Sequence, residues 1–440
     1  MEETIAAIST ALGVGAISII RVSGNESLEI VNKIFRGKDL TKVDTHTIHY
    51  GHIIDNDKVI DEVLVTVMKG PKSFTTEDIV EINCHGGIAT TKKILELLLL
   101  KGCRLAEPGE FTKRAFLNGR IDLLEAEGVM DVLNAKTEKS RTLAINQLSG
   151  KTSKMIEDLR QKIVEVLANI EVNIDYPEYQ DIEQMTNDHL ADKLLEIEKN
   201  LDIIIKNSEN GKLLKEGINV SIIGRPNVGK SSILNRLLEE DKAIVTDIEG
   251  TTRDIVEGTI NIDGLIINFI DTAGIRKTDD LVESIGVKKS IELIDKSDLV
   301  LFVLNNNEEL TEEDKHILEK LEDKNHIVVI NKMDLESKIN LSNEKNIVYV
   351  SALEDKNIDL LKDKIKEIYQ LEHIETDDLT YLTNARSISL VKEAKQAIMD
   401  AKEGINLNVP IDMVEIDVKR AWDLLGEVIG KTYQEELINQ

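Results

Sequence analysis

The feature that most constrains this chain is one block, Gly-Arg-Pro-Asn-Val-Gly-Lys-Ser, at residues 224–231. The apolar run at 219–223 before it predicts a buried strand, and the residues from 231 to 238 open a helix. The two glycines of the block let the backbone curl, so that its N–H groups point inward at phosphate oxygens. Lys230 then reaches the terminal phosphates, and the Ser231 hydroxyl is placed on Mg²⁺. The block therefore predicts a phosphate-binding loop between a strand and a helix.

Three more blocks follow in order: Asp271-Thr-Ala-Gly, then Asn331-Lys-Met-Asp, then Ser351-Ala-Leu. Asp271 ends an apolar run, so its carboxylate can hold Mg²⁺ through water. The carboxylate of Asp334 accepts two hydrogen bonds from guanine, at N1–H and at the exocyclic amine. Adenine has a lone pair at N1 and no amine there, so its complex would leave this carboxylate unpaired. Four blocks in this order predict a GTPase domain.

We expect the nucleotide to meet the phosphate loop, the loop after the first helix and the three later blocks. The Gly274 N–H senses the γ-phosphate, Lys332 lies over the base, and the Ser351-Ala352 backbone meets the guanine carbonyl. The expected GTP-binding residues are Asn227, Val228, Gly229, Lys230, Ser231, Ser232, Thr246, Asp247, Ile248, Glu249, Gly250, Thr251, Thr252, Asp271, Thr272, Ala273, Gly274, Asn331, Lys332, Asp334, Ser351 and Ala352.

Hydrolysis needs a group that orients the attacking water. The residue after Gly274 is Ile275, whose side chain cannot form a hydrogen bond. Asn227, with backbone carbonyls near Thr246, Ile248 and Thr251, would instead bind a monovalent cation where an arginine finger supplies charge. The alternative is that Asn227 only shapes its own turn. Thr252 is the natural second Mg²⁺ ligand. Glu283 is a candidate for positioning water, although residue-level logic favours a merely solvated side chain.

Composition limits the number of domains, the kinds of binding surface and the cellular compartment. The chain has 440 residues, enough for two or three domains, and a net charge of −27 argues against an overall basic nucleic-acid-binding surface. Two cysteines are too few for a disulfide scaffold and indicate a reducing cytosol. The uncharged stretch Thr4–Ile20 has an acidic flank and two interior glycines, so we expect a strand, a loop and a second strand there, with no signal peptide or membrane span.

Hydrophobic periodicity divides the chain into four parts. Residues 1–118 combine β-type runs with one strong helix at Thr90–Lys101, which indicates an α+β unit. Residues 119–215 are helical. Residues 216–373 alternate strands and helices as in a doubly wound parallel sheet. Residues 374–440 are helical again, and we expect their first helix to begin at Leu379. We therefore expect an α/β multidomain protein whose GTPase domain is inserted into a helical domain.

Several long blocks outside the GTPase domain make the chain resemble the tRNA modification GTPase family known as MnmE or TrmE, over nearly its whole length. They include Thr4-Ile-Ala-Ala-Ile-Ser-Thr, Cys84-His-Gly-Gly, Pro108-Gly-Glu-Phe-Thr-Lys-Arg-Ala-Phe-Leu-Asn-Gly-Arg-Ile-Asp-Leu, Asn173-Ile-Asp-Tyr-Pro-Glu and Asp247-Ile-Glu-Gly-Thr-Thr-Arg-Asp. The resemblance implies an N-terminal domain similar to tetrahydrofolate-binding domains that dimerises. Its folate positions (5-formyltetrahydrofolate or a related folate) match Arg21, Glu81 and Arg120.

The resemblance also implies ligands and roles in the GTPase domain. The Mg²⁺ positions match Ser231 and Thr252, and the K⁺ positions match Asn227, Thr246, Ile248 and Thr251. The catalytic positions match Glu283, Lys230 and Thr252. The family works as a homodimer in the cytoplasm, with an FAD-dependent partner (MnmG or GidA) in a heterotetramer. Together they add an aminomethyl or carboxymethylaminomethyl group to carbon 5 of the tRNA wobble uridine.

Three expectations stay open. The family pattern ends with Cys-Ile-Gly-Lys, whereas this sequence stops at Asn439-Gln440, so it stays open whether the chain as given supports tRNA modification as well as binding and hydrolysing GTP. A basic patch of Lys113, Arg114 and Arg120 binds a ligand or pairs with nearby carboxylates. The alternative function is a regulatory GTPase switch of the ribosome-assembly type, whose GTPase blocks look much the same.

Overall fold

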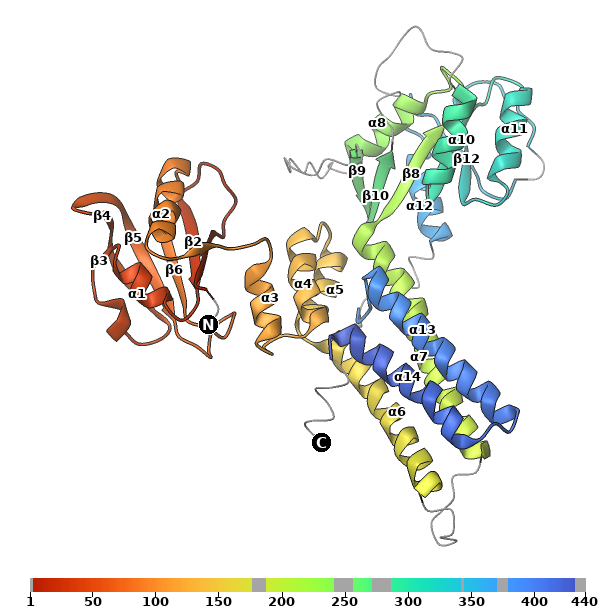
Figure 1. Ribbon diagram of the computed structural model, residues 1–440. Coiled ribbons are helices and arrows are strands. Elements are labelled where there is room, and N and C mark those ends of the chain that lie inside the picture. Colours follow the sequence, from red (N-terminus) through yellow and green to blue (C-terminus); the bar gives the residue numbers. More distant parts are fainter. Residues whose placement is uncertain are drawn as a thin grey trace. The chain divides into compact units, whose positions relative to one another are not determined.

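A computed structural model describes residues 3–175, 187–240, 256–270, 286–341, 344–369 and 379–431 of the chain (Figure 1). The fold divides into two compact units, residues 1–129 and 130–440. Each unit has its own hydrophobic core, and each is described by itself below.

The first unit is built on a seven-stranded sheet in the order β3-β4-β5-β6-β2-β1-β7. Its strands are β1 (Ile5–Ile8), β2 (Ile17–Ser23), β3 (Phe35–Arg36), β4 (Thr47–Asp55), β5 (Lys58–Met68), β6 (Ile79–His85) and β7 (Arg104–Leu105). Its helices are α1 (Ser27–Asn32), α2 (Ile88–Leu100) and α3 (Glu110–Leu117), with a short 3₁₀ turn at Leu40–Lys42. α2 packs on β1, β2, β5 and β6. The predicted α+β unit is confirmed, as are the two strands and connecting loop within Thr4–Ile20.

The helical part of the second unit contains four long helices that pack in pairs. They are α6 (Lys151–Asp175), α7 (Asn187–Glu216), α13 (Ala385–Asn406) and α14 (Ile411–Ile429), and the shorter α5 (Glu138–Leu148) precedes them. The limit between the two units falls within α4 (Leu123–Asn134). α13 packs against both α7 and α14, and α14 packs against α6 (Figure 1). The apolar stripe of α6 faces the core: Ile156, Ile163 and Ile170 are fully buried, and Leu167 is partly buried.

Between α7 and α13 the chain forms a six-stranded sheet in the order β13-β12-β11-β8-β10-β9. The strands are β8 (Ile218–Ile223), β9 (Val256–Ile262), β10 (Leu265–Ile270), β11 (Leu299–Asn305), β12 (His326–Asn331) and β13 (Ile347–Tyr349). The helices are α8 (Lys230–Glu240), α10 (Gly286–Lys296), α11 (Glu312–Leu321) and α12 (Ile358–Ile368). All strand pairs are parallel except β9 with β10. Since α7 and α13, on either side of this α/β unit, pack together, the predicted insertion is confirmed.

The predicted start of the helix after the α/β unit was wrong. We expected it at Leu379, but α13 begins at Ala385, where the Asn384 side chain caps it by accepting a hydrogen bond from the Arg386 N–H. Leu379 and Tyr381 are instead buried in the core beneath the six-stranded sheet. Their apolar character therefore reflects packing against the sheet, and it was misread as helical periodicity.

Candidate nucleotide site

The phosphate loop joins β8 directly to α8 and has an unusual backbone. Gly224 has a φ of +143°, and a Cβ at this position would lie 2.3 Å from the Val303 carbonyl oxygen of β11. Asn227 also has a left-handed backbone, with a φ of 63°, and its side chain is exposed. Val228 is buried and fixes the far side of the loop. The two glycines thus allow a tight curve that passes close to the neighbouring strand.

Lys230, the first residue of α8, points back into this curve. Its Nζ donates hydrogen bonds to the carbonyl oxygens of Gly224 (2.8 Å) and Arg225 (2.7 Å). Burial of the side chain lowers the pKa of Lys230. Ser231 and Ser232 follow in the first turn of α8, where the helix N-terminus favours anions. The arrangement is suited to polyphosphate, because a partly buried ammonium and a helix N-terminus converge on one curved backbone.

Asn331 links the phosphate loop to the later blocks. It is the last residue of β12, and its side chain is buried. Its Nδ2 donates to the Val228 carbonyl oxygen at 2.9 Å, and its Oδ1 accepts from the Ala352 N–H at 3.1 Å. A Cβ on Gly229 would lie 2.0 Å from the same Nδ2. One carboxamide therefore holds together three segments that are far apart in the sequence.

The predicted base-recognition residues lie beside this bridge. An Asp334 Oδ1 accepts a hydrogen bond from the Ser351 hydroxyl at 2.6 Å, and this bond lowers the pKa of Asp334. Lys332 has a left-handed backbone, with a φ of 64°. Asp334 is exposed and ionised at neutral pH, so it is available to accept hydrogen bonds from a base.

Arg236 of α8 also contributes to this region, although no motif predicted it. Its Nε donates to the Ala352 carbonyl oxygen at 3.0 Å, so α8 is tied to the loop after β13. The two residues are 116 positions apart. No local pattern connects residues at such a separation.

Several predicted nucleotide residues lie outside the described part of the chain. These are Thr246, Asp247, Ile248, Glu249, Gly250, Thr251, Thr252, Asp271, Thr272, Ala273, Gly274 and Glu283. The other predicted residues lie at the carboxyl ends of parallel strands, in the loops that follow them, or in the first turn of α8: Asn227, Val228, Gly229, Lys230, Ser231, Ser232, Asn331, Lys332, Asp334, Ser351 and Ala352. This edge is where ligands bind in open α/β sheets.

In the first unit, two of the predicted folate residues form an ion pair across neighbouring strands. Arg21 of β2 faces Glu81 of β6, with Nη2 2.7 Å from Oε1. The Arg21 guanidinium also lies 5.6 Å from the centre of the Phe111 ring. Arg120 stacks separately on Phe74, with its guanidinium carbon 5.0 Å from the ring centre. Both arginines thus lie over aromatic rings, which suits them to flat ligands.

Arg114, one residue of the basic patch left open above, is paired with carboxylates, whereas Lys113 and Arg120 are exposed. Arg114 is only 4 % exposed, and its guanidinium donates to Glu77 at 3.0 Å, to Glu110 at 3.0 Å and to the Glu3 carbonyl oxygen at 2.8 Å. Arg104 binds the same Glu110 and is the main reason why the pKa of that carboxyl falls to about 2. Arg114 therefore anchors α3 to the sheet.

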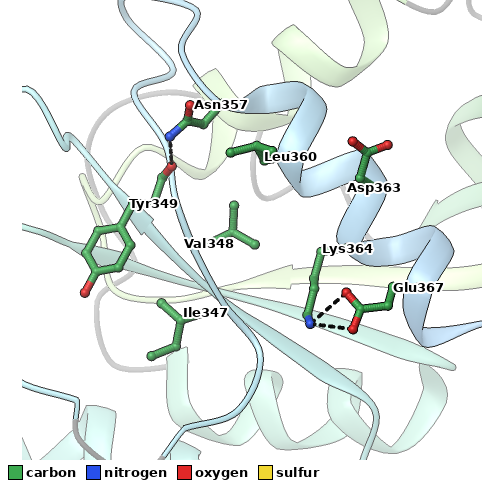
Figure 2. Close-up of a pocket in the computed structure, with 8 residues that line it drawn as sticks. All are labelled: Ile347, Val348, Tyr349, Asn357, Leu360, Asp363, Lys364 and Glu367. Carbon is green, nitrogen blue, oxygen red and sulfur yellow. Dashed lines mark hydrogen bonds and ion pairs between the residues drawn. The ribbon is translucent and has the colours of Figure 1, made fainter.

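A groove of about 640 Å³ lies elsewhere on the α/β unit, between the edge strand β13 and α12 (Figure 2). Asn357 closes one end by donating from Nδ2 to the Tyr349 carbonyl oxygen at 2.9 Å, and the Lys364–Glu367 ion pair lies at the other (Figure 2). The described residues that we expect to contact the nucleotide do not line this groove. It is therefore separate from the nucleotide site.

Comparisons with known proteins show which family the chain belongs to. A family model for the GTP-binding protein TrmE N-terminus matches residues 4–120, and a model for the MnmE helical domain matches residues 123–440. The chain belongs to the MnmE family. Among curated MnmE relatives, that of Bacillus cytotoxicus is 54 % identical over 100 % of this chain and 97 % of its own length, and that of Bacillus subtilis is 51 % identical over 100 % and 98 %. Both are described as tRNA modification GTPase MnmE.

A solved structure resembles part of this MnmE-family chain. It is a variant of Era from Aquifex aeolicus bound to GDP and AlF₄⁻, with 30 % sequence identity and a TM-score of 0.26 over 41 % of this chain and 67 % of its own. Among the described helices, none is long and apolar enough to cross a membrane.

Proposed function

We propose that this chain is a GTPase that acts in tRNA modification. The observation that carries the proposal is the Asn331 bridge, because it brings the phosphate loop and the Ser351-Ala352 loop to one place on the sheet edge. These loops recognise opposite ends of a guanine nucleotide. The full-length relatives described as tRNA modification GTPases support the second half of the proposal.

The described residues divide the binding task between them. Lys230 and the N-terminus of α8 offer positive charge to the β- and γ-phosphates, where charge builds up during phosphoryl transfer. Asp334 accepts from guanine N1–H and its amine. The hydrogen bond from the Ser351 hydroxyl lowers the pKa of Asp334 below its ordinary value, so the carboxylate is ionised at neutral pH and can accept these bonds.

Metal ions complete the proposed site. Ser231 and Thr252 would hold Mg²⁺, while Asn227 with Thr246, Ile248 and Thr251 would hold K⁺. Asn227 suits this role because its left-handed backbone leaves the amide exposed at the rim of the loop. Both cations would supply positive charge to the phosphates, with K⁺ in the place where other GTPases have an arginine finger. Glu283 would position the attacking water, with Lys230 and Thr252 as the other catalytic residues.

The first unit would supply the one-carbon donor. We place a 5-formyltetrahydrofolate or a related folate at Arg21, Glu81 and Arg120, in a homodimer. Arg21 keeps part of its fork exposed beside the Phe111 ring, which fits a flat pteridine with several acceptors. An FAD-dependent MnmG-type partner, in a heterotetramer in the cytoplasm, would share the work on tRNA. We keep 1–118, 119–215, 216–373 and 374–440 as the proposed domain limits.

Two measurements test this function. Mass spectrometry of tRNA nucleosides from a strain lacking the protein should show wobble uridines without the C5 substituent. Unchanged wobble uridines would instead favour a regulatory GTPase of the ribosome-assembly type. GTP hydrolysis by the purified chain should be much faster in K⁺ than in Na⁺ at equal ionic strength, and equal rates would remove the proposed K⁺ site.

A further inference from the structure

Between β8 and α8 the phosphate loop carries one charged side chain, Arg225, which bonds to residues outside the curve that would hold phosphate. Its Nε lies 3.0 Å from the Asp314 Oδ2 and its Nη2 lies 3.0 Å from the Glu308 Oε2. Asp314 is in α11 and Glu308 lies in the loop after β11. The Arg225 side chain therefore connects the loop to a separate segment of the α/β unit.

The two partners of Arg225 differ sharply in their surroundings. The Asp314 side chain is fully buried, whereas the Glu308 side chain is 48 % exposed. Asp314 is also part of the capping box of α11, and its Oδ2 accepts from the Thr311 N–H at 3.0 Å and from the Thr311 hydroxyl at 2.8 Å. The helix N-terminus and the capping bonds hold this carboxylate in place independently of Arg225.

The backbone of Arg225 is at the same time part of the phosphate site. Its carbonyl oxygen accepts the hydrogen bond from Lys230 Nζ at 2.7 Å. The loop around it adopts backbone conformations that residues with side chains rarely occupy, at Gly224 and at Asn227. Such a loop keeps its shape only if the surrounding structure holds it. Asp314 provides a fixed attachment through the Arg225 side chain.

We propose that Asp314 is a positioning residue for nucleotide binding, acting through Arg225 on the shape of the phosphate loop. The inference rests on the proposed function, because it concerns the same nucleotide site. A fully buried carboxylate would set the place of Arg225, and the Arg225 carbonyl would then set the direction of the Lys230 ammonium. Glu308 would add little, because an exposed ion pair is screened by water.

The test compares Asp314→Asn with Glu308→Gln in the full chain, using fluorescence titration with labelled GDP and GTP. Asp314→Asn keeps the shape of the side chain and an acceptor for Thr311 but loses the charge. Its Kd for both nucleotides should rise about tenfold, the usual worth of one hydrogen bond between charged groups. Glu308→Gln should stay within about twofold of the wild type. Selectivity for GTP over XTP should be unchanged, since Asp334 is untouched.

A second pair of variants separates positioning from stability. Arg225→Lys keeps a cation near Asp314, so its Kd for both nucleotides should rise less than that of Asp314→Asn. Arg225→Met combined with Asp314→Asn leaves no buried unpaired charge, so its thermal midpoint should return toward that of the wild type while its Kd stays high. If the double variant or Asp314→Asn binds GDP as tightly as the wild type, the positioning role is wrong. If the wild type itself binds neither nucleotide, the proposed function falls and this inference falls with it.

Discussion

Replacing Gly229 by alanine should disable the nucleotide site by displacing one side chain. The new Cβ would lie 2.0 Å from Asn331 Nδ2, and ordinary contact begins at 3.4 Å, so the amide must retreat by about 1.4 Å. That retreat breaks the bonds of Asn331 to the Val228 carbonyl and to the Ala352 N–H, now 2.9 and 3.1 Å long. Gly229 also has a φ of +101°, which strains any residue with a Cβ.

The size of the effect follows from these contacts. Each lost hydrogen bond costs about 1 kcal/mol net, and the backbone strain adds about 1 kcal/mol. The total of about 3 kcal/mol corresponds to roughly 100-fold weaker GDP binding, since 1.4 kcal/mol is a factor of ten. Alanine at Gly13, where a Cβ meets nothing within 4 Å, should leave GDP affinity unchanged and serves as the control.

A double-mutant cycle identifies the cause. Asn331→Ala alone should weaken GDP binding by about 2 kcal/mol, because it removes the same two hydrogen bonds. Once the side chain is gone there is nothing for the new Cβ to displace. The Gly229→Ala and Asn331→Ala double variant should therefore bind GDP no more weakly than Gly229→Ala alone, as measured by fluorescence titration. Strictly additive losses, or a Gly229→Ala protein within threefold of the wild type, would refute this account of the bridge.

Three other predictions follow from single contacts. Asp334→Asn should shift the base preference from GTP to XTP, because an amide can donate to the xanthine carbonyl that replaces the guanine amine. Hydrolysis rates with both nucleotides measure the shift, and an unaltered affinity for GTP would contradict it. Glu110 has a folded pKa of about 2 against an ordinary value of 4.5, so its stabilising effect is complete above pH 4.5 and is lost as pH falls toward 2. Thermal unfolding followed by circular dichroism should therefore show a smaller loss of stability over that pH range in Glu110→Gln than in the wild type. Gly217→Ala should lower the unfolding midpoint, since its Cβ would lie 2.3 Å from the Ile266 carbonyl oxygen; an unchanged midpoint would show that the strand can move aside.

Local sequence patterns predicted the order of elements well. The strand, glycine loop and helix around residues 224–231 form as expected, because each depends on neighbours in the sequence. The buried stripe of α6 follows from helical periodicity in the same way. The insertion of the α/β unit was also predictable, since helical patterns flank it without a glycine- or proline-rich linker.

The contacts that hold the candidate site together were not predictable. Thr311-Glu-Glu-Asp314 is a recognisable capping box, yet nothing local indicates that Arg225, 89 residues away, binds the same carboxylate. The double role of Asn331 depends on the phosphate loop and the loop after β13 lying on either side of β12. Leu379 and Tyr381 were misread for a related reason, because they are buried in the core of the distant sheet.

The connection between the helical part and the α/β unit suggests how a displacement of the phosphate loop would move the helical part. Gly217 alone separates α7 from β8, and β8 ends at the phosphate loop. The returning chain is held beside this junction, because Lys215 pairs with Asp131 at 2.7 Å and the Thr383 hydroxyl donates to the same carboxylate at 3.2 Å. Both chain crossings thus share one charged cluster. A displacement of β8 would move α7 directly, because no loop lies between them. We therefore expect nucleotide binding to change the ion pair between Lys215 and Asp131 before other contacts of the helical part.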